Sequence, residues 1–229
     1  THLSVTELSS VLTKIASVNP ALGVSVMVPN SLGPGELLQN YGTEQQKNQY
    51  LPGLADGSYI PCFGLTGPNN GSDATGSIDT GTVIINQLKE KCVNLKINKR
   101  YITLGPIANL IGLAFNLKDP NNLLESGKEG TTVVLIEKDH PGLKQLTHHN
   151  PLDVGFPNGT LKGQLQIPLD YIIGGEKNAG NGWKMLMECL AAGRGICLPA
   201  TANACSKVST LGVLQYSKHR KQFKLPLIE

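Results

Sequence analysis

Two short segments about 30 residues apart carry the residue types best suited to chemistry. The first, residues 65–73, reads LTGPNNGSD, and the second, residues 99–103, reads KRYIT. The glycines of the first segment allow close backbone approach, and its N–H groups and the Ser72 hydroxyl can donate to anionic oxygens, so it suits a phosphate-bearing cofactor. In the second, Tyr101 and Thr103 would project from the same side of a strand, which suits a large planar ring.

Together these segments resemble the middle domain of acyl-CoA dehydrogenases, which bind FAD and desaturate fatty acyl thioesters. Further stretches match the family in the same order along the chain: 41–47, 50–57, 180–183, Arg194 and 220–223. The Tyr-Ile-Thr of residues 101–103, in place of the family's usual Trp-Ile-Thr, points to the bacterial long-chain (FadE-like) branch.

The resemblance implies FAD contacts for most of the matched residues. Residues 65–66 would touch the pyrimidine side of the ring, residues 101–103 would cover its other face near N5, and Ser72 with the Gly71 amide would bind the pyrophosphate. The implied contacts to the ring and pyrophosphate are Leu65, Thr66, Gly71, Ser72, Tyr101, Ile102 and Thr103.

The resemblance also implies contacts to substrate and to a second subunit. Arg194 would support the catalytic carboxylate and the thioester, with Ser72 and Thr103 as further substrate contacts. The residues that would reach the FAD of a neighbouring subunit, and so imply a homo-oligomer, are Arg220, Gln222 and Phe223.

Desaturation removes a weakly acidic α-proton and transfers the β-hydrogen as hydride, which no side chain accepts. The resemblance implies that FAD N5 takes this hydride from a long-chain acyl-CoA in β-oxidation and that an electron-transfer flavoprotein is the acceptor. The family's base is a glutamate, usually located beyond Glu229, and in some members it stands at the position of Gly193. Glu188 lies six residues before Arg194 and would point elsewhere on a helix. We therefore expect a fragment that lacks its catalytic base and cannot turn over.

Hydrophobic periodicity predicts an α+β fold: a helical N-terminal segment, a central antiparallel β-barrel-like domain and the start of a C-terminal helical bundle. We expect helices over residues 4–18 and 43–55, one short helix and a loop within 21–39, and one long or two consecutive helices after residue 182. The expected strands are 80–85, 93–97, 107–116, 131–136 and 163–167. The expected domains are residues 1–58, 59–173 (flavin-binding) and 174–229.

Composition and short motifs exclude several other classes. The net charge is +3 and no basic run with interleaved aromatic residues occurs, which disfavours nucleic-acid binding. The phosphate loop of nucleotide hydrolases is excluded because no lysine lies between residues 48 and 88. Adjacent residues of an extended chain point to opposite faces, so His148 and His149 cannot easily share one metal ion, and we expect no metal site.

The cysteines and the apolar runs bear on location. Five cysteines without a C-x-x-C pair indicate reduced thiols in a cytosolic compartment, and the resemblance to the bacterial branch implies a bacterial cytoplasm. No apolar run is as long as a membrane span, and the first residues do not have the pattern of a signal peptide. The resemblance leaves peripheral contact with the inner membrane open, because the branch includes peripheral membrane proteins.

Two other interpretations stay open. One is an acyl-CoA oxidase or a flavin monooxygenase of the same fold, which would differ in how oxygen reaches the reduced flavin. The other is a non-catalytic module, in which the β-domain holds an acyl chain, a lipid or a protein.

Overall fold

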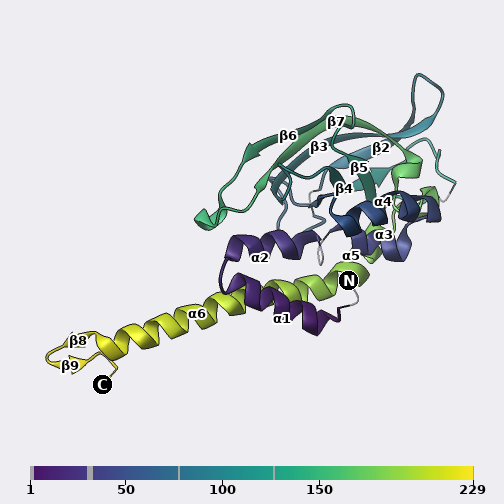
Figure 1. Cartoon of the computed structure of the whole chain (residues 1–229). Coiled ribbons are helices and arrows are strands. Elements are labelled where there is room, and N and C mark those ends of the chain that lie inside the picture. The colour runs from purple at the N-terminus through teal and green to yellow at the C-terminus, as the bar shows by residue number, and fades with distance from the viewer. Residues whose placement is uncertain (1–2, 30–32, 77, 126, 229) are drawn as a thin grey trace.

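The structure, a computed structural model, describes residues 3–29, 33–76, 78–125 and 127–228 (Figure 1). It consists of helices at the N-terminal end, a curled sheet, and a helical C-terminal part whose last helix projects from the body. The α+β fold is confirmed.

Among the described residues, the N-terminal part contains four α-helices, and their ends follow from local sequence. They are α1 (Val5–Ala16), α2 (Pro20–Met27), α3 (Pro34–Tyr41) and α4 (Glu44–Asp56). The Ser4 hydroxyl accepts the Glu7 N–H at 3.3 Å and the Glu7 carboxylate accepts the Ser4 N–H at 2.8 Å, which is the capping box that the sequence predicts. The expectation of one helix within 21–39 was wrong. A second helix forms because Pro34 occupies a first-turn position, where a missing N–H costs nothing.

Seven strands form one mixed sheet. They are β1 (Pro61–Gly64), β2 (Thr80–Ile85), β3 (Lys91–Thr103), β4 (Leu110–Lys118), β5 (Gly130–Glu137), β6 (Leu143–His148) and β7 (Asn158–Pro168). The order is β1-β4-β2-β3-β7-β6, with β5 also paired to β4. Both β1 and β2 run parallel to β4, whereas the other pairings are antiparallel as expected.

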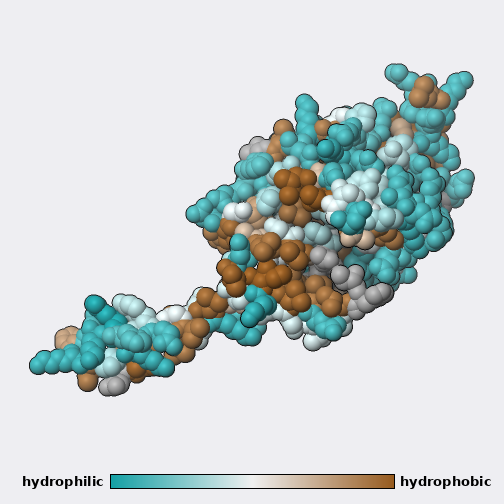
Figure 2. Space-filling view, in the orientation of Figure 1, coloured by the Kyte–Doolittle hydropathy of each residue, from teal (hydrophilic) through white to brown (hydrophobic). Residues whose placement is uncertain are grey.

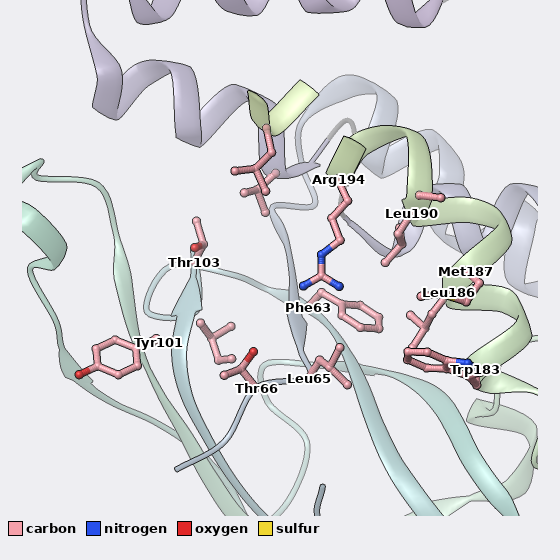
Figure 3. A pocket seen from close by; sticks show the side chains of 14 residues that line it. Phe63, Leu65, Thr66, Tyr101, Thr103, Trp183, Leu186, Met187, Leu190 and Arg194 are labelled. Carbon is pink, nitrogen blue, oxygen red and sulfur yellow. The ribbon is translucent and has the colours of Figure 1, made fainter. Parts of the chain in front are cut away.

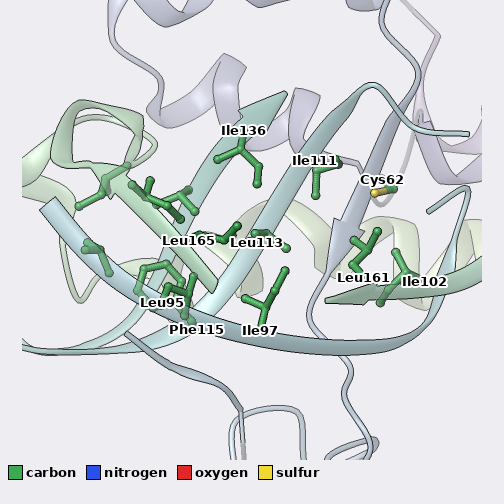
Figure 4. Packing of buried hydrophobic residues seen from close by; sticks show 14 of the residues in the cluster. Cys62, Leu95, Ile97, Ile102, Ile111, Leu113, Phe115, Ile136, Leu161 and Leu165 are labelled. Carbon is green, nitrogen blue, oxygen red and sulfur yellow. The ribbon is translucent and has the colours of Figure 1, made fainter. Parts of the chain in front are cut away.

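Strand β4 is buried on both faces, which explains its unbroken apolar sequence. On the inner face Leu113 and Phe115 pack with residues such as Leu95 and Leu165 inside the curl of the sheet (Figure 4). On the other face Leu110 and Ala114 belong to a second core with residues of the helices. This second core includes Met185 and Leu186 and so packs the C-terminal helix α5 (Gly182–Ala192) against the sheet.

The C-terminal part is a single helical run with one irregular turn. It comprises α5 (Gly182–Ala192), a π-helical turn (Gly193–Cys197), α6 (Leu198–His219) and a small hairpin of β8 (Lys221–Gln222) and β9 (Leu225–Pro226). The Leu198 N–H donates to the Gly193 carbonyl, five residues back. Pro199 has no N–H, so the α-helical hydrogen bond from residue 199 to the Gly195 carbonyl cannot form. Short 3₁₀ turns lie at Pro151–Asp153, Leu169–Tyr171 and Glu176–Asn178.

Candidate flavin site

A cavity of about 280 Å³ lies between the ends of β1 and β3 and the helical run from α5 to α6 (Figure 3). Its walls are mainly apolar, with three hydroxyl-bearing residues and one arginine among them. The lining residues are Val28, Phe63, Leu65, Thr66, Tyr101, Ile102, Thr103, Trp183, Leu186, Met187, Leu190, Ala191, Arg194 and Leu198. The two segments selected from the sequence therefore meet at one cavity.

The segment after β1 is held by its own loop. The Asn70 side chain accepts the Gly67 N–H at 2.7 Å and donates to the carbonyls of Leu65 at 3.3 Å and Ala74 at 3.0 Å. Thr66 gives its carbonyl to the Arg100 N–H at 3.0 Å, while its hydroxyl has no hydrogen-bond partner among the described residues. Thr66 thus presents a free hydroxyl to the cavity.

Gly71 and Ser72 lie outside the cavity lining, on exposed backbone farther along the loop. A Cβ at Gly71 would meet nothing within 4 Å, whereas a Cβ at Gly67 would lie 3.0 Å from the Asn98 carbonyl oxygen. Of the two glycines, Gly67 is the one that close backbone approach requires.

The end of β3 departs from the regular alternation expected from the sequence. Its pairing with β7 shifts between Lys99 and Ile102, and Tyr101 has φ of +59°. The Asn158 side-chain amide donates to the Tyr101 carbonyl at 3.1 Å and to the Thr103 hydroxyl at 3.4 Å. Because Thr103 accepts this bond, its own proton stays available to a ligand.

This bulge changes the direction of the tyrosine. Both Tyr101 and Thr103 line the cavity, but the Tyr101 ring points away from Arg194 (Figure 3). The ring centroid lies 4.7 Å from that of His149 and 4.8 Å from the Arg100 guanidinium carbon. Tyr101 is 49% exposed, so its ring forms part of the cavity edge.

Arg194 projects from the π-helical turn into the cavity, toward Phe63 (Figure 3). It forms no hydrogen bond or ion pair with any described residue. Trp183, Leu186 and Leu190 recur at helical spacing on α5 and form the wall beside it. A guanidinium without a counter-charge, set among apolar groups, is suited to an anionic or polarised oxygen of a ligand.

No carboxylate is among the residues that line this cavity in the described part of the chain. Glu188 instead hydrogen-bonds with the Tyr41 hydroxyl and lies 3.9 Å from Lys184. It lines a different pocket, next to α3. The expectation that this chain lacks the catalytic base stays a prediction.

The three residues expected to act across a subunit interface lie far from the cavity. Arg220, Gln222 and Phe223 sit at or beside the β8–β9 hairpin, beyond the end of α6 (Figure 1). Phe223 is 98% exposed. The chain therefore does not bring these residues to its own cavity.

The histidine pair and the cysteines do not line the cavity and do not form a metal site among the described residues. His149 Nε2 lies 2.9 Å from the Thr160 hydroxyl, and His148 is the last residue of β6. Burial raises the pKa of the Cys62 thiol. Within residues 3–29, 33–76, 78–125 and 127–228, no group of three or more His, Cys, Asp or Glu side chains could hold a metal ion. No described helix has the length and apolar character that crossing a bilayer requires.

Several residues that shape the site were missed by sequence reasoning: Phe63, Asn70, Lys99, Asn158 and Trp183 as a cavity wall. Asn70 carried a detectable signal, because asparagine is common in turns, where its side chain bonds nearby backbone. Asn158 and Lys99 act through partners distant in the chain, which one sequence does not reveal.

Similar proteins are consistent with this architecture. A family model described as the acyl-CoA dehydrogenase N-terminal domain matches residues 1–58. A protein named HemX from Proteus mirabilis is 43% identical over 100 residues, 43% of this chain and 59% of that protein. An acyl-CoA dehydrogenase from Bacillus subtilis is 30% identical over 216 residues, 93% of this chain and 53% of that protein.

Solved structures show the same fold. The acyl-CoA dehydrogenase from Bacillus anthracis complexed with FAD aligns with a TM-score of 0.79 at 23% identity, over 99% of this chain and 36% of that chain. This chain spans about half the length of the first curated relatives it matches. The matched N-terminal domain, the aligned relatives and the shared fold together support the assignment of this chain to the acyl-CoA dehydrogenase family.

Proposed function

We propose that this chain is part of an FAD-dependent acyl-CoA dehydrogenase that introduces an α,β double bond into a fatty acyl-CoA. The observation that carries the proposal is that residues 65–66, residues 101–103 and Arg194 line one cavity. Short motifs that match the family only by chance would not be expected to line the same cavity.

The residues present fit a flavin ring. The cavity is close to the lower end of the range of about 300–1,000 Å³ found for ligand pockets. Its apolar walls, including Leu65, Ile102 and Trp183, suit a flat aromatic system, and the hydroxyls of Thr66 and Thr103 are available as donors. Leu65 and Thr66 would contact the pyrimidine side, and Thr103 would donate near N5.

The remaining assigned contacts are proposals that rest on the family resemblance. Ser72 and the Gly71 amide would bind the pyrophosphate of FAD from their exposed loop. Arg220, Gln222 and Phe223 would reach the FAD of a neighbouring subunit, since they lie far from the cavity of their own chain. The protein would therefore be a homo-oligomer.

When bound, FAD supplies the hydride acceptor that protein side chains lack. Arg194 would bind the thioester oxygen and stabilise the negative charge that develops there when the α-proton leaves. The apolar wall of α5 would exclude water and so strengthen that interaction. The carboxylate that takes the α-proton would come from outside this chain, since none lines the cavity among the described residues.

The finer assignments follow the same resemblance. We propose a long-chain substrate from the Tyr-Ile-Thr of residues 101–103, an electron-transfer flavoprotein as acceptor, and a cytoplasmic location with peripheral contact to the inner membrane. We also propose a division into residues 1–58, a flavin-binding middle domain of residues 59–173, and residues 174–229 as part of a helical domain.

The test is an anaerobic titration of the purified full-length protein with a long-chain acyl-CoA. We expect bleaching of the visible flavin band and reduction of an added electron-transfer flavoprotein. Hydrogen peroxide in air, without reduction of that acceptor, would indicate the oxidase alternative. A protein that purifies with flavin yet shows no bleaching at saturating thioester would contradict the proposed activity, and one that binds no flavin would indicate a binding module.

A further inference from the structure

Lys99 is a charged side chain with 0% exposure, an unusual place for an ammonium group. Its Nζ lies 2.9 Å from Asp79 Oδ2 and donates to the carbonyls of Ala114 at 2.8 Å and Leu65 at 3.2 Å. These partners supply three acceptors for its three N–H donors, so the buried group is fully satisfied.

The lysine ties three parts of the chain to one point. Asp79 precedes β2, Ala114 lies within β4, and Leu65 is the first residue after β1. Asp79 is itself fixed, because both its carboxylate oxygens accept the Asn98 N–H, at 3.2 and 3.3 Å. Lys99 thus holds a cavity-lining residue to the rigid centre of the sheet.

These hydrogen bonds determine which polar groups at the cavity edge remain available to a ligand. Lys99 Nζ donates a hydrogen bond to the Leu65 carbonyl, and the Arg100 N–H donates one to the Thr66 carbonyl. Both carbonyls of this cavity-lining pair are therefore engaged by β3, and the Thr66 hydroxyl is left without a described partner. The two carbonyls at this edge are therefore occupied while the Thr66 hydroxyl can donate, which complements a ring edge that carries carbonyl oxygens.

We propose that the buried Lys99–Asp79 pair is a positioning device for the ligand site: it fixes Leu65 and Thr66 so that this edge of the cavity presents donors to the pyrimidine side of a bound flavin. The inference rests on the proposed FAD function and deepens it. Lys99 acts through Leu65 and is not itself a catalytic residue.

The ion pair and its surroundings are consistent with this role. Burial lowers the pKa of Lys99, and the opposing charge of Asp79 raises it. On the strands packed around Lys99, the β1 and β4 sides face it with carbonyls, and on β7 its pairing partner is Leu161. Asp79 is the charged group among the described residues that contacts it.

The test compares the full-length wild-type protein with K99M/D79N and a matched core variant, L95A. The double variant removes both charges without leaving either one buried alone, which often preserves folding. Leu95 is buried on the same strand but does not line the cavity. FAD affinity, the visible flavin spectrum and the flavin midpoint potential are measured for each.

We expect K99M/D79N to bind FAD about tenfold more weakly or worse, the effect of losing one charge-assisted hydrogen bond. Its flavin potential should shift to more negative values, because fewer donors stabilise the charge added on reduction. L95A should lose stability but keep the wild-type spectrum and potential. Wild-type affinity and potential in folded K99M/D79N would overturn the proposal.

If K99M/D79N does not fold, K99Q/D79N supplies the test, because it also removes both charges but leaves an amide at each position that can form hydrogen bonds. We expect it to bind FAD more weakly than the wild type does, because a neutral amide holds the Leu65 carbonyl less firmly than an ammonium group. Wild-type FAD affinity in folded K99Q/D79N would overturn the proposal. A wild-type protein that binds no FAD would instead contradict the proposed function, so the two failures are distinguishable.

Discussion

At the scale of single residues, the site combines groups that are free with groups that are fixed. The side chains of Arg194 and Thr66 have no hydrogen-bond partner among the described residues, whereas the side-chain amides of Asn70 and Asn158 and the Lys99 ammonium group donate to backbone carbonyls of residues that line the cavity. Free donors beside fixed backbone are typical of a preorganised binding site.

Arg194 provides the first prediction. R194Q in the full-length protein should lower kcat about 10²-fold, because it removes the positive charge proposed to face the developing oxyanion. FAD content should stay close to that of the wild type. The matched control is K184Q, which removes an exposed charge from α5 outside the cavity lining and should leave kcat unchanged. Wild-type kcat and KM in R194Q would contradict the assigned role.

Two glycines provide the second prediction. A Cβ at Gly64 would lie 2.7 Å from a Leu113 methyl and 3.3 Å from the Lys99 stem, so G64A should cost about 1–3 kcal/mol of unfolding free energy through overpacking. The same substitution at Gly71 meets nothing within 4 Å, and G71A should change stability by less than about 0.5 kcal/mol. Urea unfolding of both variants measures the difference, and equal losses would show that the packing around Gly64 is not as tight as described.

At the scale of elements, the sequence predicts those with strong local signals. The Ser4 and Glu7 capping box and the turn at Gly57 mark α1 and the end of α4, and β2 has the bounds that its apolar run indicates. Strand β1 was missed because it has only four residues, and β6 because its sequence LKQLTH is largely polar. These strands form because the sheet pairs them, which local propensity does not report.

The site divides in the same way. Leu65 and Thr66 could be selected through the family resemblance and Thr103 from its spacing to Tyr101, and all three line the cavity. Sequence alone could not predict the bulge at Tyr101. It also could not predict that Lys99 is buried while its neighbour Arg100 is exposed, because one register shift decides which of the two side chains points inward.

The packing of α4 against the sheet provides the third prediction. Burial raises the pKa of Tyr50 to about 12, with the nearby Glu137 carboxylate adding to the effect. Between pH 10 and 12 the unfolded tyrosine ionises while the folded one stays protonated, so unfolding becomes easier as the pH rises through this window. Below pH 10 this group adds no pH dependence.

The measurement is urea unfolding of wild type and Y50F at about pH 9 and pH 11. Tyr50 has no hydrogen bond through its hydroxyl to any described residue, so the variant should fold normally. Y50F should lose less stability between these two pH values than the wild type. An equal loss in both proteins would show that Tyr50 is not buried as described.

At the scale of the whole molecule, the most conspicuous feature is the projection of α6 and its hairpin from the body. Figure 2 shows hydrophobic surface around α2 and in places along α6. Leu22 on α2 and Val213 and Leu214 on α6 are exposed. Helices in proteins gain most of their stability from packing, and the outer half of α6 is largely exposed in the described part of the chain, so we expect it to pack against a partner.

The fourth prediction follows from the proposed homo-oligomer. F223A in the full-length protein should weaken FAD retention although Phe223 lies far from its own cavity, because it would contact the cofactor of a neighbour. Dialysis followed by flavin absorbance measures retention, and sedimentation measures the assembly. A stable monomer with full FAD content would contradict this assignment.

The central claim is that the segments at residues 65–66 and 101–103 enclose one flavin ring. The most direct test is a crystal structure of the full-length protein with FAD bound. We expect the ring inside this cavity, with its pyrimidine side at Thr66 and its N5 near the Thr103 hydroxyl. A ring bound elsewhere, with these two segments free of contact to it, would contradict the account.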